Sequence, residues 1–165
     1  MNHLRLFESF NKVDIHNICK IYHIRNYTIN ENGYIDANGN VNLNDMKLTK
    51  LPLKFNEING NFWCYFNYDL ASLDGCPKYI GGNFDCSYCH ITTFEHFPKH
   101  IGGDFNCNNN PIFEIWKLFG DASKIELFND MDIIQDGVVI LDRLNYFLEE
   151  IGRPTVKFVN GYKYI

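Results

Sequence analysis

Residues 80–89 read IGGNFDCSYC, and residues 101–110 read IGGDFNCNNN. Residues 58–67 read INGNFWCYFN, so one pattern occurs three times at offsets of 22 and then 21 residues. A more divergent copy begins near Gly39. Sequence repeats with a period of about 20 to 50 residues are typical of proteins built from stacked, similar turns. We therefore divide this region into four units, residues 35–57, 58–79, 80–100 and 101–118.

The units share the frame apolar-x-apolar-x-x-Asn/Cys-x-apolar. Side chains two positions apart in a strand point to the same side, so we expect Phe84 and Cys86 to face a core and Asp85 to face solvent. The amides of Asn67 and Asn110 are expected to turn inward and bond backbone groups where the chain bends. The glycine pairs at 81–82 and 102–103 are expected to form tight bends with positive φ before each strand.

This frame resembles the leucine-rich repeat, whose core is L-x-L-x-x-N/C-x-L, although Phe and Cys replace the usual Leu pair and the lead-in is one residue longer. The segments NYTIN, GYID, LTKLPLKF, IWKLF and LDRLNYFLEEIG are similar to those of short leucine-rich-repeat-like proteins predicted in tailed-phage genomes. The opening LRLFESF also looks like the openings of small phage proteins. These resemblances imply an α+β fold, namely a short solenoid of about four turns with parallel strands. They also imply that the protein is encoded by a phage.

The ends of such a solenoid need caps, because terminal turns expose apolar edges. We expect one domain over residues 1–165, with residues 1–34 as the N-terminal cap, 35–118 as the repeats and 119–165 as the C-terminal cap. In the first cap, Asp14 is expected to cap a helix over 15–22, and Asn32-Gly33 is expected to form the turn of a hairpin.

The C-terminal end of the chain, from residue 113 onward, is expected to contain three helices and two hairpins. A helix with Ile115, Trp116 and Phe119 should stop near Gly120, and a second should begin at Asp121 or Ser123. A hairpin over 133–140 and an amphipathic helix over 141–151 follow. The chain is expected to close with a second hairpin, over 155–165, that turns at Asn160-Gly161.

Composition excludes several classes of function. The chain has 165 residues, a formal net charge of −5 and only 15 Lys and Arg, which argues against a nucleic-acid partner. No apolar run approaches the roughly 20 residues of a membrane span, and no signal-peptide core opens the chain. We therefore expect a cytoplasmic protein without membrane contact, in the host cytoplasm if the protein is phage-encoded.

Four cysteines of the repeats allow two interpretations. Cys64, Cys86 and Cys107 occupy one repeat position, and Cys89 completes a C-x-x-C with Cys86. All four fall where the frame calls for small inward residues, so we interpret them as buried, reduced core residues, with no cofactor. Zinc binding by this cluster is the alternative, although a ladder of equivalent positions forms a line rather than a tetrahedron.

The strand face opposite the core is the candidate binding surface. Trp63 is the most informative residue there, because an outward Trp favours aggregation unless a partner covers it, and Tyr and Trp are typical binding anchors. The alternative is that Trp63 and Tyr65 pack on a neighbouring loop or cap. The candidate binding residues are Trp63, Tyr65, Phe66, Asp85, Ser87, Tyr88, Asn106 and Asn108.

The sequence therefore predicts a non-enzymatic module that binds a protein partner through its strand face. Interference with host machinery or defence is one use that such a module could have, and nothing in the residues specifies the target. No nucleophile, second acid or phosphate-binding loop at a fixed spacing indicates catalysis. Two alternatives stay open: a structural or assembly protein of a virion, and a zinc-binding protein that uses the cysteine cluster.

Overall fold

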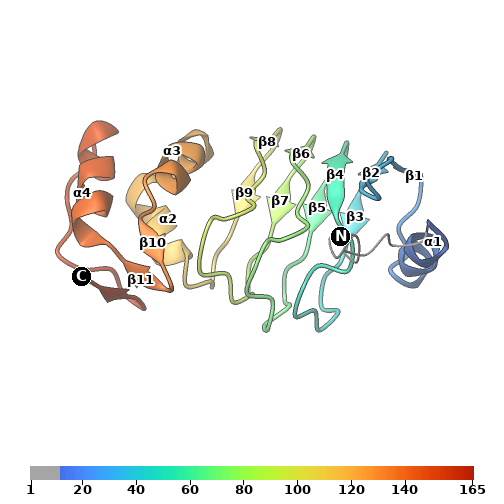
Figure 1. The fold of residues 1–165 in the computed structure, drawn as a ribbon, viewed down its shortest axis with the longest axis horizontal. Coiled ribbons are helices and arrows are strands. Elements are labelled where there is room, and N and C mark those ends of the chain that lie inside the picture. The colour runs from blue at the N-terminus through green and yellow to red at the C-terminus, as the bar shows by residue number, and fades with distance from the viewer. Residues whose placement is uncertain (1–11) are drawn as a thin grey trace, which may run out of the picture.

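The computed structural model describes residues 12–165, which form four α-helices, one 3₁₀ helix (η1) and twelve short strands. The mixed α+β class expected from the sequence is confirmed (Figure 1). The elements in chain order are α1 (Lys12–Ile21), β1 (Tyr27–Ile29), β2 (Ile35–Ala37), β3 (Val41–Asn42), β4 (Phe55–Ile58), β5 (Phe62–Trp63), β6 (Tyr79–Ile80), β7 (Phe84–Asp85), β8 (His100–Ile101), β9 (Phe105–Asn106), α2 (Phe113–Phe119), η1 (Ala122–Lys124), α3 (Ile125–Asp130), β10 (Ile134–Gln135), β11 (Val138–Val139), α4 (Leu141–Glu150) and β12 (Lys163–Tyr164).

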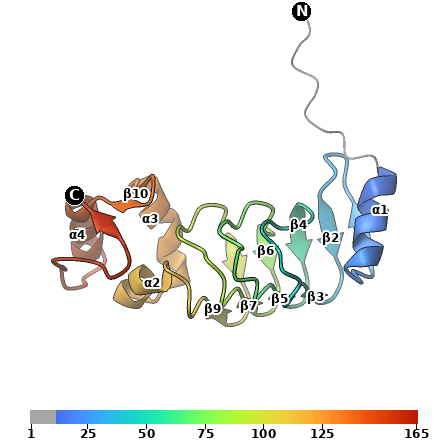
Figure 2. The ribbon, with the colours of Figure 1, turned by 90° about the horizontal axis from the view of Figure 1, so that it is seen from below.

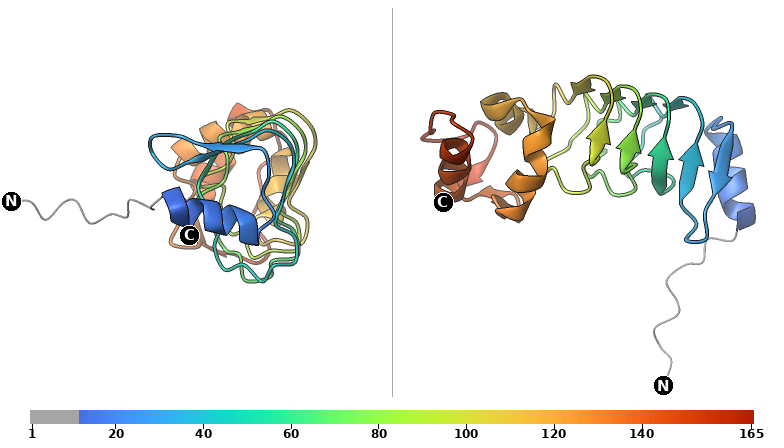
Figure 3. Two further views of the ribbon diagram at one scale, coloured as in Figure 1. Left: turned by 90° about the vertical axis from the view of Figure 1, so that its right-hand side faces the viewer. Right: turned by 90° about the horizontal axis from the view of Figure 1, so that it is seen from above.

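The repeats form two sheets that run along the molecule. One has the strand order β1-β2-β4-β6-β8 and the other β3-β5-β7-β9, and every pair is parallel except β1 with β2. In the second sheet, Val41, Phe62, Phe84 and Phe105 are successive partners in one register. The sequence period therefore becomes the strand register, and the turns lie over one another when seen end on (Figure 3).

A column of phenylalanine rings fills the space between the two sheets. The ring centroids of Phe62 and Phe84 are 5.7 Å apart and those of Phe84 and Phe105 are 5.4 Å apart, with interplanar angles of 19° and 25°. The expectation that Phe84 and Cys86 face the core is confirmed, since both are almost fully buried. Offset stacking of this kind adds to the stabilisation that comes from burying the rings.

The inward asparagines are also confirmed. Asn67 is fully buried, and its Nδ2 donates to the carbonyls of Leu43 and Cys64, each at 2.8 Å. Its Oδ1 accepts from the backbone N–H groups of Met46 and Leu48, each at 3.0 Å. One side chain thus satisfies four backbone groups that would otherwise be buried without partners.

The expectation of positive φ at the paired glycines is wrong, because none of the four has a left-handed backbone. These glycines instead allow adjacent units to approach closely. A Cβ on Gly102 would collide with the carbonyl oxygen of Gly81, and one on Gly82 would collide with Oδ1 of Asn61. That same Asn61 oxygen accepts from the backbone N–H of Asn83 at 2.7 Å, so glycine leaves room for an asparagine that bridges two units.

The bridging asparagines recur along the sheets. Oδ1 of Asn40 accepts from the N–H of Asn61 at 2.8 Å, and Oδ1 of Asn83 accepts from the N–H of Asp104 at 2.9 Å. We call Asn40, Asn61 and Asn83 the asparagine ladder, whose last bond comes from the backbone N–H of Asp104.

Helix α1 lies at the N-terminal end of the row of strands (Figure 2). Its Ile15 and Cys19 are buried and belong to the core. The prediction that Asp14 caps this helix is wrong, since helical backbone already includes Lys12. Asp14 lies in the first turn, where its carboxylate still interacts favourably with the helix dipole. The hairpin of β1 and β2 is confirmed, with Gly33 at φ +78° in its turn. Residues 1–11 of the expected cap, with the opening LRLFESF, lie outside the described residues.

At the other end, α2 stops at Gly120, which is left-handed with φ 61° as the sequence predicts. Of the two expected starts for the next helical segment, Asp121 is correct and Ser123 is wrong. The Asp121 carboxylate accepts from the N–H of Ser123 at 2.9 Å and so caps η1, which runs directly into α3. The hairpin of β10 with β11 and helix α4 form as expected.

The predicted terminal hairpin is wrong. The turn at residues 160–161 exists, but β12 pairs in parallel with β11, through Val138 with Lys163 and Val139 with Tyr164. In the preceding segment, the side chain of Asn145 of α4 bonds both the N–H and the carbonyl of Val156, at 2.8 and 3.0 Å, so the backbone groups of this residue pair with a helix side chain and not with a strand.

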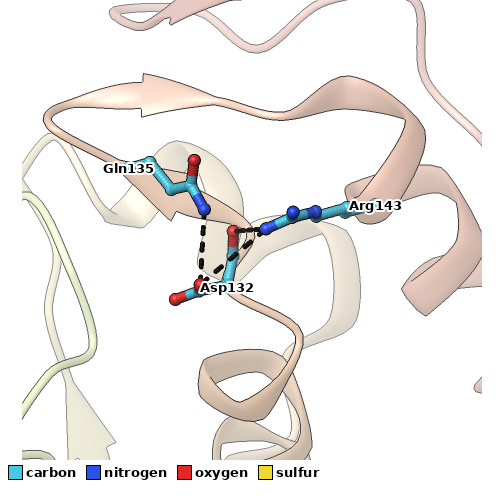
Figure 4. Close-up of polar contacts among 3 residues, drawn as sticks. All are labelled: Asp132, Gln135 and Arg143. Atoms are coloured by element: carbon cyan, nitrogen blue, oxygen red, sulfur yellow. Dashed lines mark hydrogen bonds and ion pairs between the residues drawn. The ribbon is translucent and has the colours of Figure 1, made fainter.

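Asp132 lies in the turn after α3 and contacts both β10 and α4 (Figure 4). Its backbone carbonyl accepts from Arg143 of α4 at 2.9 Å, and its carboxylate accepts from Gln135 of β10 at 3.3 Å. Arg143 also lies 3.9 Å from that carboxylate. The buried apolar residues form one continuous cluster from Ile15 to Val159, so the end pieces share a core with the repeats.

Candidate interaction surface

The outward row of the β3-β5-β7-β9 sheet contains Asn42, Trp63, Asp85 and Asn106, which are neighbours in register. Trp63, Asp85 and Asn106 are half-buried and Asn42 is exposed, so Trp63 is not sealed in the interior. In the next row, Tyr65 is half-buried and Asn108 is exposed. The structure therefore brings most of the candidate residues to one face.

Ser87 is the exception, since it is 5% exposed and offers no contact surface. Its N–H and its hydroxyl both donate to Oδ1 of Asp85, at 2.8 and 2.6 Å. Tyr65 and Asn108 occupy the same repeat position and are not buried, so the hydrogen bonds to Asp85 distinguish Ser87 from them. Ser87 instead orients the carboxylate of Asp85.

Four rings form an exposed aromatic cluster beside this row. Phe66 is its centre, because its ring centroid lies 5.2 Å from that of Tyr65, 6.2 Å from that of Tyr68 and 4.8 Å from that of Tyr88. The exposed fractions of Phe66, Tyr68 and Tyr88 are 37%, 64% and 42%. Tyr68 is not among the residues that the sequence predicts for this surface. Two residues separate Asn67 from Leu70, whereas one residue stands at this place in the next two units, so the shared frame does not assign a direction to Tyr68.

The backbone under the cluster is strained. Asp45, Phe66, Tyr88 and Asn109 occupy one repeat position, and all four are left-handed, with φ of 51°, 59°, 53° and 58°. Asp and Asn adopt this conformation readily, whereas bulky residues seldom do. The strain at an aromatic residue here is of order 1 kcal/mol. The turn requires the conformation but does not require an aromatic side chain, so folding alone does not account for Phe66 and Tyr88.

Asp85 places one fixed negative charge in the row. Its Oδ1 accepts the two bonds from Ser87, and its Oδ2 accepts from Nδ2 of Asn106 at 3.0 Å. The ion pairs within residues 12–165 join Lys99 to Glu126, Lys117 to Glu114 and Arg143 to Asp132, so none of them involves this carboxylate. Asp85 is thus held in place by neutral donors and carries an uncompensated charge beside Trp63.

The cysteines of the repeats lie in the core. Cys89 takes the place of the inward asparagine, and its Sγ donates to the carbonyl of Cys64 at 3.2 Å. Burial raises the pKa of the Cys86 thiol well above its usual range and that of the Cys107 thiol to about 12. A side-chain interaction between the two thiols, and then burial, raise the pKa of Cys64, whereas the same thiol–thiol interaction lowers the pKa of Cys89.

Within the part of the chain that the structure describes, no group of three or more His, Cys, Asp or Glu side chains is placed to hold a metal ion.

A cavity of about 310 Å³ lies between the return segment 96–99 and the η1–α3 region. His96, Lys99, Glu126 and Asn129 contribute to its walls, and Lys99 forms an exposed ion pair with Glu126 at 3.4 Å. None of the candidate binding residues lines this cavity.

Comparisons with protein-family models, with curated proteins and with solved structures gave no significant match. Among residues 12–165, none of the helices has the length and apolar character needed to cross a bilayer. The observations that bear on function are therefore those of the outward row and of the aromatic cluster.

Proposed function

We propose that this chain is a non-enzymatic, protein-binding module built as a short leucine-rich-repeat-like solenoid of one domain. Two features support the solenoid: the parallel registers that repeat every 21 or 22 residues, and the inward amides of Asn67 and Asn110 at the Asn/Cys position of the repeat. Since the sequence resembles short tailed-phage proteins, a host or phage protein is the proposed partner, met in the host cytoplasm.

The strained, exposed aromatic cluster is the observation that carries the binding proposal. Phe66 and Tyr88 hold a conformation that the equivalent Asp45 and Asn109 adopt at lower cost. Strain that folding does not require is concentrated at functional sites, and exposed Tyr, Phe and Trp are typical of binding hot spots. Trp63 and Tyr65 extend the same face toward Asp85.

The test is a double variant, Phe66→Asn with Tyr88→Asn, which removes both rings while keeping the left-handed backbone. Tagged wild-type and variant proteins are produced in the natural host, and crosslinked partners are quantified by mass spectrometry. We expect the variant to lose at least one partner that the wild type enriches, because truncation of hot-spot aromatic residues removes much of the binding free energy.

Tyr79→Asn is the matched control. Tyr79 is exposed to a similar degree, at 38%, and also stacks on a neighbour, His100, but it lies in the other sheet. A partner lost by the double variant and kept by Tyr79→Asn supports the proposal. Unchanged capture by the double variant would overturn it, because this variant is expected to stay folded.

A further inference from the structure

The row of Trp63, Asp85 and Asn106, together with the aromatic cluster, combines flat apolar rings with one carboxylate. Asp85 is the charged member of the outward rows of the four-stranded sheet, whose other accessible members are asparagine, tryptophan and tyrosine. A ligand for this face must therefore offer a surface that stacks on rings and a charge that complements one anion.

The geometry points to an arginine side chain of the protein partner as the ligand of this face, an inference that rests on the proposed function. A guanidinium is planar, stacks on aromatic rings and donates a charge-assisted hydrogen bond to a carboxylate oxygen. Lysine lacks the plane that stacks on rings, and a nucleobase lacks the positive charge that the carboxylate of Asp85 favours.

The carboxylate of Asp85 is prepared for such a ligand. A carboxylate has about four acceptor positions, of which Ser87 and Asn106 occupy three. These bonds fix its orientation without neutralising its charge. Since Asp85 is half-buried, its interaction with a cation is screened less than that of a fully exposed carboxylate.

Trp63 stands next to this carboxylate. Trp63 and Asp85 are register partners in parallel strands, which places their backbones about 4.8 Å apart. A guanidinium bonded to Asp85 can therefore lie against the indole face, the best of the aromatic faces for a cation. The acidic net charge of −5 also favours a cationic partner over an anionic one.

The experiment titrates the ¹⁵N-labelled full chain with a capped Gly-Arg-Gly peptide and follows both tryptophan indole N–H signals by NMR. The same peptide with citrulline in place of arginine has the same shape without the charge, and a lysine peptide has the charge without the plane. We expect arginine to shift the Trp63 signal, lysine to shift it less and citrulline to leave it unmoved. Trp116 packs on Phe94, Phe105 and Phe119, so its signal is the internal reference.

Asp85→Asn tests the carboxylate, because it removes the charge and keeps an oxygen that can accept from Ser87. We expect it to weaken binding of the arginine peptide roughly tenfold, as for loss of a charge-assisted bond. Asp74→Asn is the matched control, since it makes the same change of charge at an exposed position on a return segment. We expect it to bind the arginine peptide as the wild type does.

Three results would overturn the arginine assignment: equal binding of the citrulline peptide, equal affinity of Asp85→Asn and Asp74→Asn, or a stronger Trp63 shift with a proline-rich peptide. A Trp63 shift that depends on protein concentration alone would assign the face to a second copy of the chain and would also overturn it. If these occur while partner capture still depends on Phe66 and Tyr88, the proposed function stands and only the arginine inference fails.

Discussion

The ring of Phe66 lies 4.8 Å from the ring of Tyr88, and both residues hold left-handed backbones, with φ of 59° and 53°. The two rings thus meet on the surface at a position where the neighbouring units carry Asp45 and Asn109. The contact between the two rings stabilises the folded protein, whereas the left-handed backbones of the two residues destabilise it. The free energy of unfolding of a variant without the rings shows which of these two effects is larger.

We predict that Phe66→Asn with Tyr88→Asn leaves the free energy of unfolding unchanged or raises it by up to about 1 kcal/mol, because asparagine tolerates the left-handed region. Urea unfolding followed by circular dichroism measures this difference. A loss of about 2 kcal/mol or more would show instead that the rings stabilise the fold.

Asn67→Ala should be among the most destabilising single changes in the repeats. It leaves the carbonyls of Leu43 and Cys64 and the N–H groups of Met46 and Leu48 without their partner. Each buried orphan costs about 1 kcal/mol or more, so we expect a loss of about 3 kcal/mol or more. Urea unfolding of Asn67→Ala is compared with that of the exposed Asn108→Ala. Similar losses for the two variants would contradict the role given to the buried amide.

Gly102→Ala and Gly120→Ala separate two reasons for glycine. Gly120 is left-handed in open space, so alanine there should cost about 1 kcal/mol. Gly102 lacks positive φ, but its Cβ would collide with the backbone carbonyl of Gly81, and a backbone atom cannot move aside without opening the sheet. We expect Gly102→Ala to cost about 2 kcal/mol or more. Thermal unfolding of both variants gives the order, and the reverse order would refute the close-approach explanation.

The buried thiols predict how stability depends on alkaline pH. Burial raises the pKa of Cys107 from 9.0 to about 12, so the folded protein keeps a proton that the unfolded chain releases. The free energy of unfolding is therefore unaffected by this thiol below about pH 9 and falls between about pH 9 and 12, by less than about 1.4 kcal/mol per pH unit for each such group.

Urea unfolding at several pH values in this range measures the slope. Cys107→Ala should make the slope shallower, whatever the variant loses in packing at neutral pH. An unchanged slope in Cys107→Ala would contradict the protonated state assigned to this thiol.

The repeats could be predicted because their evidence is local and periodic. The offsets of 21 and 22 residues between Phe62, Phe84 and Phe105 are also the offsets of the strand register, so the stacked rings follow from the sequence alone. The inward Asn67 follows from the same frame.

Other features could not be read from local patterns. The burial of Ser87 accompanies its hydrogen bonds to Asp85, which the strand alternation does not predict. The parallel pairing of β12 with β11 joins residues about 25 positions apart, so no local pattern distinguishes it from a terminal hairpin. The close approach of Gly102 to the backbone of Gly81 involves the neighbouring unit. The glycine pairs therefore suggested positive φ, whereas glycine is needed there because a Cβ would collide with the adjacent unit.

The asparagine ladder makes each unit compatible with its neighbours on both sides. Asn61 accepts a bond from the unit that follows, and Gly60 makes room for the asparagine of the unit that precedes it. A duplicated copy of residues 80–100 would bring both halves of this joint with it. Duplication of one unit would therefore lengthen the two sheets by one strand each, with the contacts to both neighbours already provided, while the helical ends stay as they are.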